Sequence, residues 1–170
     1  MSDKAITSMN VEILPKSIRN HMTGELNLDI IDEIAASSGD GWVYAEKTIA
    51  ISDGSQNLIE VTDDYIKTDF DGVVAVGDKI PWIVIKHTGT VDGHGPTNNG
   101  ILFCADGGTA AYNLADGIYL SPGEMIVLKL PNTTVDNFHC IPVKDTNGKP
   151  TAAGTGNVFI KFAAILTNVG

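Results

Sequence analysis

Arginine is nearly absent from this sequence, which has one, Arg19, among 170 residues. Acidic side chains outnumber basic ones by 21 to 11, and the formal net charge at pH 7 is −10. Nucleic-acid binding requires clustered cations that displace counterions from phosphates, and phosphate recognition generally favours guanidinium groups. The composition therefore predicts neither a nucleic-acid partner nor an anionic membrane partner. We expect the acidic side chains on a solvated surface.

Long apolar runs are missing as well. The longest, such as residues 80–85, span a few positions, whereas a transmembrane helix needs roughly 20. The first four residues lack the layout of a signal peptide, which predicts a cytosolic product that is not individually secreted. Apolar residues make up 43% of the chain, enough for the core of one domain over residues 1–170. Residues 1–20 are either an arm that reaches a neighbour or a frayed terminus.

Only two cysteines occur, Cys104 and Cys140, and apolar residues flank both. This setting favours reduced, buried thiols that pack as small apolar side chains. A disulfide between adjacent strands is the alternative, and spacing alone does not exclude it.

Catalytic motifs are not found in the sequence. It has no Gly-x-Ser-x-Gly elbow, no Cys-Gly-Ser-Cys segment and no phosphate-binding Gly-x-x-x-x-Gly-Lys loop. Eleven aromatic residues are few for a sugar-stacking surface, and Trp42 and Trp82 lie in apolar segments that suit a core. The sequence therefore predicts a protein that is not an enzyme and has no cofactor, no catalytic or metal-binding residues and no small-molecule substrate.

Two metal-site alternatives remain open. A cupin-like β-barrel enzyme needs two histidines one residue apart, whereas His87 and His94 are seven apart; His139 is on a later segment that could approach His87. A calcium loop of EF-hand type from Asp69 would require glutamate where Ile80 stands. An irregular calcium site near residues 63–71 is the second alternative.

Turn chemistry is the strongest local signal. Asp-Gly or Asn-Gly pairs, which tolerate the positive φ of tight turns, recur through the chain at 40–41, 53–54, 71–72, 92–93, 99–100, 106–107, 116–117 and 147–148. Between them lie short segments rich in β-branched and aromatic residues, at 42–52, 57–62, 73–76, 80–87, 101–105, 117–120, 125–130, 137–143 and 158–166. This rhythm predicts an all-β, single-domain β-sandwich of eight to ten strands. Segment 26–36 fits a helix or a strand, and residues 145–156 read as a long loop.

The second half of the sequence resembles a family of virion structural proteins of tailed bacteriophages, especially marine ones. The stretches that carry the resemblance are 78–90, 101–113, 121–124 and 128–132. The resemblance implies a β-sandwich, in one version a jelly roll, which decorates a phage head. Proteins of this kind are generally not enzymes, and head decoration proteins often form trimers that bridge major capsid subunits.

We therefore expect a capsid decoration protein, a homotrimer on the outside of the major capsid protein lattice, assembled in the bacterial cytoplasm. Its acidic surface is unsuited to the DNA-facing interior of a head, and reduced cysteines fit the cytosol. A component of the tail, neck or fibre is the first alternative, and the metal-dependent enzyme is the second.

Overall fold

A computed structural model describes residues 39–169 except 69, 71, 113–116 and 152–154. The chain divides into two units, residues 1–36 and residues 37–170, and every described residue lies in the second. The predicted arm over residues 1–20 and the ambiguous segment 26–36 lie outside the described residues. No helix among the described residues is both long and apolar enough to span a membrane.

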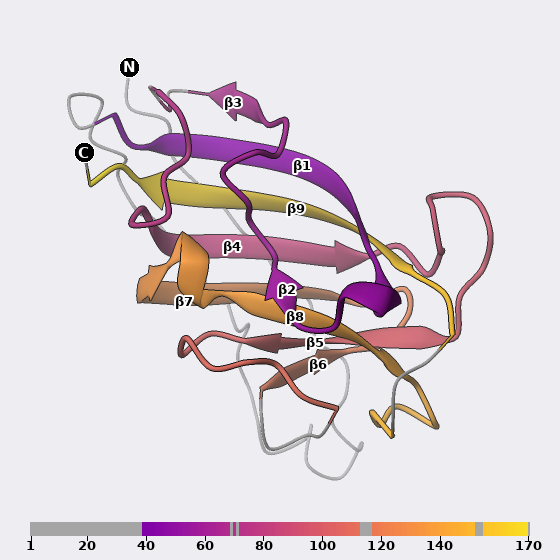
Figure 1. Cartoon of the computed structure of the whole chain (residues 1–170). Helices are drawn as coiled ribbons and strands as arrows, with labels where there is room; N and C mark the ends of the chain where they lie inside the picture. Colours follow the sequence, from indigo (N-terminus) through magenta and orange to yellow (C-terminus); the bar gives the residue numbers. More distant parts are fainter. Residues whose placement is uncertain (1–38, 69, 71, 113–116, 152–154, 170) are drawn as a thin grey trace, which may run out of the picture. The chain divides into compact units, whose positions relative to one another are not determined.

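Two antiparallel sheets face each other with the core between them, so the predicted all-β sandwich is confirmed (Figure 1). The first has five strands in the order β3-β1-β9-β4-β7. Their bounds are Gly41–Ile49 (β1), Ile66–Thr68 (β3), Lys79–His87 (β4), Met125–Thr134 (β7) and Val158–Thr167 (β9).

The second sheet has four strands in the order β2-β8-β5-β6. Their bounds are Gln56–Asn57 (β2), Asn99–Cys104 (β5), Ile118–Leu120 (β6) and His139–Lys144 (β8). Two short 3₁₀ turns, Ile51–Asp53 and Val135–Asn137, lie between strands. The strand number falls within the predicted range of eight to ten, and the jelly-roll connectivity stays a prediction.

The alternation of buried and more exposed side chains along these segments explains why they form strands. Along β9, Val158, Ile160 and Phe162 are buried and point inward, and Phe159 and Lys161 between them are half-buried on the other face. Successive side chains of a strand point to opposite faces, so such a pattern gives one core face and one outer face.

Aromatic side chains pack against one another within each sheet's side of the core. The Phe103 and Phe138 rings stack at a centroid distance of 5.7 Å, and the Tyr65 ring meets that of Phe162 edge-on at 6.3 Å. Such pairs add to the free energy gained by burying apolar area.

Several predicted elements need correction. Residues 99–100 do not form a turn but begin β5, because Gly100 lies against the ring of Tyr119 and a Cβ there would collide with it. Residues 40–41 likewise lead directly into β1. The strand predicted over 73–76 is absent from the described structure, and the strand predicted over 57–62 is reduced to β2. The prediction also missed β3, which pairs with three residues of β1.

Five of the predicted Asp-Gly or Asn-Gly turns do have the expected backbone. Their glycines have positive φ, at Gly54, Gly72, Gly93, Gly107 and Gly148. Asp71 and Asp116 lie outside the described residues, so for the pair at 71–72 only the backbone of Gly72 is described.

Candidate functional site

The two cysteines are free thiols on opposite faces of one sheet. Cys140 pairs with Phe103 in the ladder of β8 and β5, and Cys104 pairs with the next residue, His139. Because neighbouring positions alternate between faces, Cys140 points into the shared core and Cys104 to the outer face. Reduced, buried cysteines are therefore what the structure contains, as predicted.

Burial also makes both thiols poor nucleophiles. It raises the pKa of Cys140 to about 12. Burial raises the pKa of Cys104 as well, and so does its hydrogen bond to Asp106, which Sγ donates over 2.8 Å. Since the thiolate is the reactive form, neither cysteine has the setting of a catalytic thiol.

The structure does not bring His87 and His139 together. His87 lies at the end of β4 and contacts the carbonyl of Asn99, the first residue of β5. His139 pairs with Cys104, the last residue of the same strand. The two ends of β5 are about 17 Å apart at roughly 3.3 Å per residue. Among the described residues, no three His, Cys, Asp or Glu side chains are grouped to hold a metal ion.

The imidazole of His87 has a structural role. The N–H of Gly89 donates to Nδ1 over 3.0 Å, which leaves the proton on Nε2, and Nε2 lies 2.8 Å from the carbonyl oxygen of Asn99. Burial of the ring lowers the pKa of His87 below its usual value. Both nitrogens of the neutral ring are thus engaged within the fold.

The carboxylate of Asp63 is also engaged within the fold. Lys47 donates to it and to Glu60, both over 2.9 Å, and the hydroxyl of Tyr65 donates to Asp63 over 3.1 Å. Burial and the nearby Asp63 charge raise the pKa of Tyr65. Of the acidic residues considered for an irregular calcium site, Asp69 and Asp71 lie outside the described residues.

On one side of the sandwich the sheets end in β6 and β7. We call this side the open edge: β6, β7 and the cavity between them. β6 has three residues and β7 has ten, so within the described part of the chain most of β7 faces no opposite strand. Three inward side chains of β7 consequently remain half-buried: Ile126, Leu128 and Leu130. A cavity of about 510 Å³ lies between the strands, lined by Phe103, Ile118 and Leu130 among others.

The open edge is protected over part of its length. Lys129 places its ammonium group 5.0 Å from the centre of the Trp82 ring, and Pro131 interrupts the backbone donors of β7. Lysine and proline are typical devices that prevent edge strands from pairing. The segment before them, Met125 to Leu128, contains neither, and Met125 is 60% exposed.

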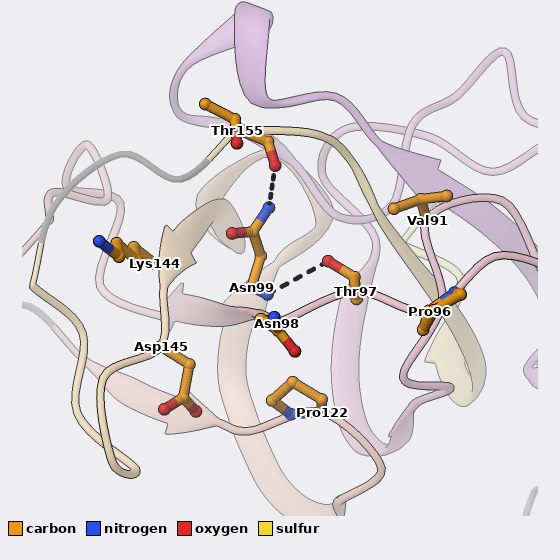
Figure 2. Close-up of a pocket in the computed structure, with 9 residues that line it drawn as sticks. All are labelled: Val91, Pro96, Thr97, Asn98, Asn99, Pro122, Lys144, Asp145 and Thr155. Atoms are coloured by element: carbon orange, nitrogen blue, oxygen red, sulfur yellow. Dashed lines mark hydrogen bonds between the residues drawn. The ribbon is translucent and has the colours of Figure 1, made fainter.

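A second cavity lies at the end of the sandwich where β4, β6 and β8 finish; we call it the loop-end pocket (Figure 2). Its volume is about 740 Å³. The lining residues come from segments that are distant in sequence: Val91, Pro96, Thr97, Asn98, Asn99, Pro122, Lys144, Asp145 and Thr155.

Hydrogen bonds fix the wall of this pocket. The amide group of Asn99 donates to the carbonyls of Thr155 and Gly156, over 3.0 and 2.8 Å, and its backbone N–H donates to Thr97 Oγ1 over 3.1 Å (Figure 2). Asn99 is 5% exposed, so this amide is a built-in part of the fold.

The carboxylate of Asp145 is held by neighbours. Burial opposes its ionisation, but hydrogen bonds from the Tyr119 hydroxyl and the N–H of Gly148 outweigh this effect, so the pKa of Asp145 lies below its usual value. Burial and the hydrogen bond to Asp145 raise the pKa of Tyr119.

Comparison of the chain with protein-family models, curated proteins and solved structures gives no match. The function is therefore argued from the residues and their geometry.

Sequence reasoning found neither cavity. The open edge follows from the unequal lengths of β6 and β7. The loop-end pocket follows from the meeting of three connections, those between β4 and β5, β6 and β7, and β8 and β9. Neither arrangement has a signature in the sequence. Asn99 was the available signal for the loop-end pocket, and the pair Asn99-Gly100 was predicted to form a turn.

Proposed function

We propose that this chain is a virion structural protein that decorates the outside of a phage head as a homo-oligomer and contacts its partner through the open edge. The observation that carries the proposal is β7: an edge strand of ten residues whose inward apolar side chains are incompletely covered. Natural edge strands are usually shielded, and an unshielded one is a template for pairing with another chain.

The sequence of β7 suits such a contact. Its first four residues, Met125 to Leu128, are apolar and carry no charge. A partner strand that paired here would gain backbone hydrogen bonds, and its side chains would cover Ile126 and Leu128. Backbone pairing supplies affinity in this mode, and the apolar pockets supply specificity.

The roles of the chemically reactive groups support a binding protein. His87, Cys104, Cys140 and Asp63 each make contacts that stabilise the fold. With a net charge of −10, the chain suits an exterior position away from packaged DNA.

The resemblance of residues 78–90, 101–113, 121–124 and 128–132 to phage virion proteins supports the assignment to a head. It also supports a jelly-roll connectivity, a trimer, and the major capsid protein as the partner. A protein that binds only the assembled lattice stabilises it by mass action.

The decisive test is a binding experiment with expanded, empty heads that lack this chain. We expect the purified protein to add to them in hundreds of copies, counted by quantitative mass spectrometry, and to raise the temperature at which they disassemble. Heads that gain neither copies nor heat resistance would refute the proposal. Recovery with tails alone, at a dozen copies or fewer, would instead identify a tail or neck component.

Variants of β7 test the contact surface. Val127→Lys places a charge in the apolar part of the open edge, and we expect it to reduce head binding at least tenfold. Thr62→Lys, an exposed position outside both sheets, is the matched control and should bind as the unmodified protein does. Equal binding by the two variants, with unchanged melting temperatures, would show that the partner uses another surface.

A further inference from the structure

The wall of the loop-end pocket contains a buried polar side chain, Asn99. Both hydrogen bonds of the Asn99 side chain use its nitrogen as donor, to Thr155 and Gly156. Within the described part of the chain, no fully buried side-chain oxygen or nitrogen lacks a partner. The carboxamide oxygen of Asn99, a residue of the cavity wall, is therefore not sealed from solvent, and Figure 2 shows it turned away from Thr155.

The surrounding wall combines two kinds of surface. Asn98 and Thr97 supply an exposed amide and a hydroxyl beside Asn99, and Val91, Pro96 and Pro122 supply apolar atoms (Figure 2). Ligand sites of small molecules commonly have this composition, with a few placed polar groups among apolar ones, and volumes of roughly 300 to 1,000 Å³. At about 740 Å³ the loop-end pocket falls within that range.

The charged groups of the lining, Asp145 and Lys144, decide which ligands suit the pocket. The carboxylate of Asp145 accepts from the Tyr119 hydroxyl and the N–H of Gly148, and its lowered pKa keeps it ionised near neutral pH, so it disfavours an anionic ligand. Lys144 is exposed, and Figure 2 shows its ammonium group directed away from the other lining residues. The groups that face the cavity are thus one carboxylate and several neutral donors and acceptors. They suit an uncharged, hydroxyl-rich molecule, whose hydroxyls can donate to the carboxylate and amide oxygens.

We propose that the loop-end pocket binds a neutral sugar residue, a pyranose whose hydroxyls hydrogen-bond to Asn98 and Asn99 and whose C–H face packs on Pro96 and Pro122. A pyranose presents hydroxyls at its edge and apolar C–H groups on its face, which matches the two surfaces of the wall. This proposal does not rest on the contact through the open edge.

Saturation-transfer NMR with the full chain tests the proposal. The probes are the methyl glycosides of glucose, galactose, mannose and N-acetylglucosamine, each at millimolar concentration. We expect transfer to at least one of them, with backbone amide shifts at Asn99, Asp145 and Gly148 in a heteronuclear spectrum. No transfer to any of the four would overturn the proposal.

A pair of asparagine variants locates the site. We expect Asn98→Ala to weaken binding of the responding sugar at least tenfold, and Asn132→Ala, an exposed asparagine on β7, to leave it unchanged. Undiminished binding by Asn98→Ala would also overturn the proposal, because the sugar would then occupy another surface. If Asn98→Ala fails to fold, the shift map of the unmodified chain decides: shifts confined to residues outside the loop-end pocket contradict it.

Discussion

The outer faces of the two sheets differ in how they are covered. On the four-stranded sheet, a second apolar layer lies outside the main core, built from Leu102, Cys104, Ala110, Ile141 and Val143. Ala110 belongs to the connection between β5 and β6, whose backbone is attached to Ser55 by a hydrogen bond of 2.9 Å. This sheet thus has a packed outer face supplied by its own connection.

The five-stranded sheet has a different outer face. The pairing register aligns Ile66, Tyr44, Ala163, Val84 and Val127 in one row across all five strands, opposite the core. Ile66, at one end of the row, is 69% exposed, and Val127 at the other end belongs to the open edge. The four-stranded sheet therefore has a covered apolar outer face, whereas the described outer face of the five-stranded sheet has apolar side chains that are partly exposed.

The largest effect should come from Lys47, which joins the two sheets. It extends from β1 to Glu60 and Asp63 in the segment after β2, and its side chain is 13% exposed. Lys47→Met leaves the partly buried carboxylates without their cation, so we expect a loss of about 3 kcal/mol in the free energy of unfolding, measured by urea denaturation. Lys161→Met is the matched control: it removes an exposed ion pair with Glu46 and should change stability by less than about 1 kcal/mol. Similar losses for both would show that Lys47 does not bridge the sheets.

A valine pair measures the difference between the two outer faces. Val143→Ala removes fully buried carbons from the second layer of the four-stranded sheet, and we expect a loss of about 2 kcal/mol. The same substitution at Val127, which is half-buried on the five-stranded sheet, should cost less than about 1 kcal/mol. Equal losses in the free energy of unfolding, measured by thermal or urea denaturation, would show that the two outer faces are equally well packed.

Acidification should weaken the end of the sandwich near His87. Burial lowers the pKa of His87 in the folded state, whereas the unfolded chain titrates near 6.5. Below about pH 6.5 the imidazole of His87 is protonated in the unfolded chain but stays neutral in the folded one. The free energy of unfolding therefore falls as the pH decreases toward the folded-state pKa, by at most about 1.4 kcal/mol per pH unit. Urea denaturation between pH 7.5 and 5 checks this. His87→Gln should reduce the pH dependence of the free energy of unfolding, whereas His94→Gln, at an exposed position, should not. An unchanged pH dependence in His87→Gln would contradict the attribution of this effect to His87.

The smallest effect concerns the order in which the thiols react. Neither cysteine should react quickly with a thiol reagent in the native protein, because burial raises the pKa of both. In rising urea we expect Cys104 to be labelled before Cys140, since the outer layer can open without disrupting the shared core. Mass spectrometry of the labelled peptides gives the order. Simultaneous labelling would mean that the second layer and the core unfold together.

Much of the sandwich could be predicted from the sequence, because alternation and turn residues act locally. The segment 158–166 was placed to within one residue of β9, since its side chains alternate regularly. The short strands were predicted poorly: β3 exists because three residues pair with β1, and nothing in its own sequence requires a strand. Conversely, residues 73–76 are rich in valine but have no partner strand among the described residues, and Val73 is exposed.

The two cavities could not have been predicted in the same way. The loop-end pocket depends on the distance between segments that are remote in sequence, such as those of Asn98 and Thr155. The cavity of the open edge depends on the difference in length between β6 and β7. Local patterns contain no information about either quantity.

The position of β9 has a consequence for synthesis. This strand follows all the others along the chain, yet it lies in the middle of the five-stranded sheet, paired with β1 on one side and β4 on the other (Figure 1). While the ribosome is still making residues before Val158, β1 and β4 each lack the strand that pairs with them in the finished sheet. The five-stranded sheet therefore cannot be completed until β9 has been synthesised. Until then, a chaperone or a neighbouring nascent chain can bind at the position between β1 and β4.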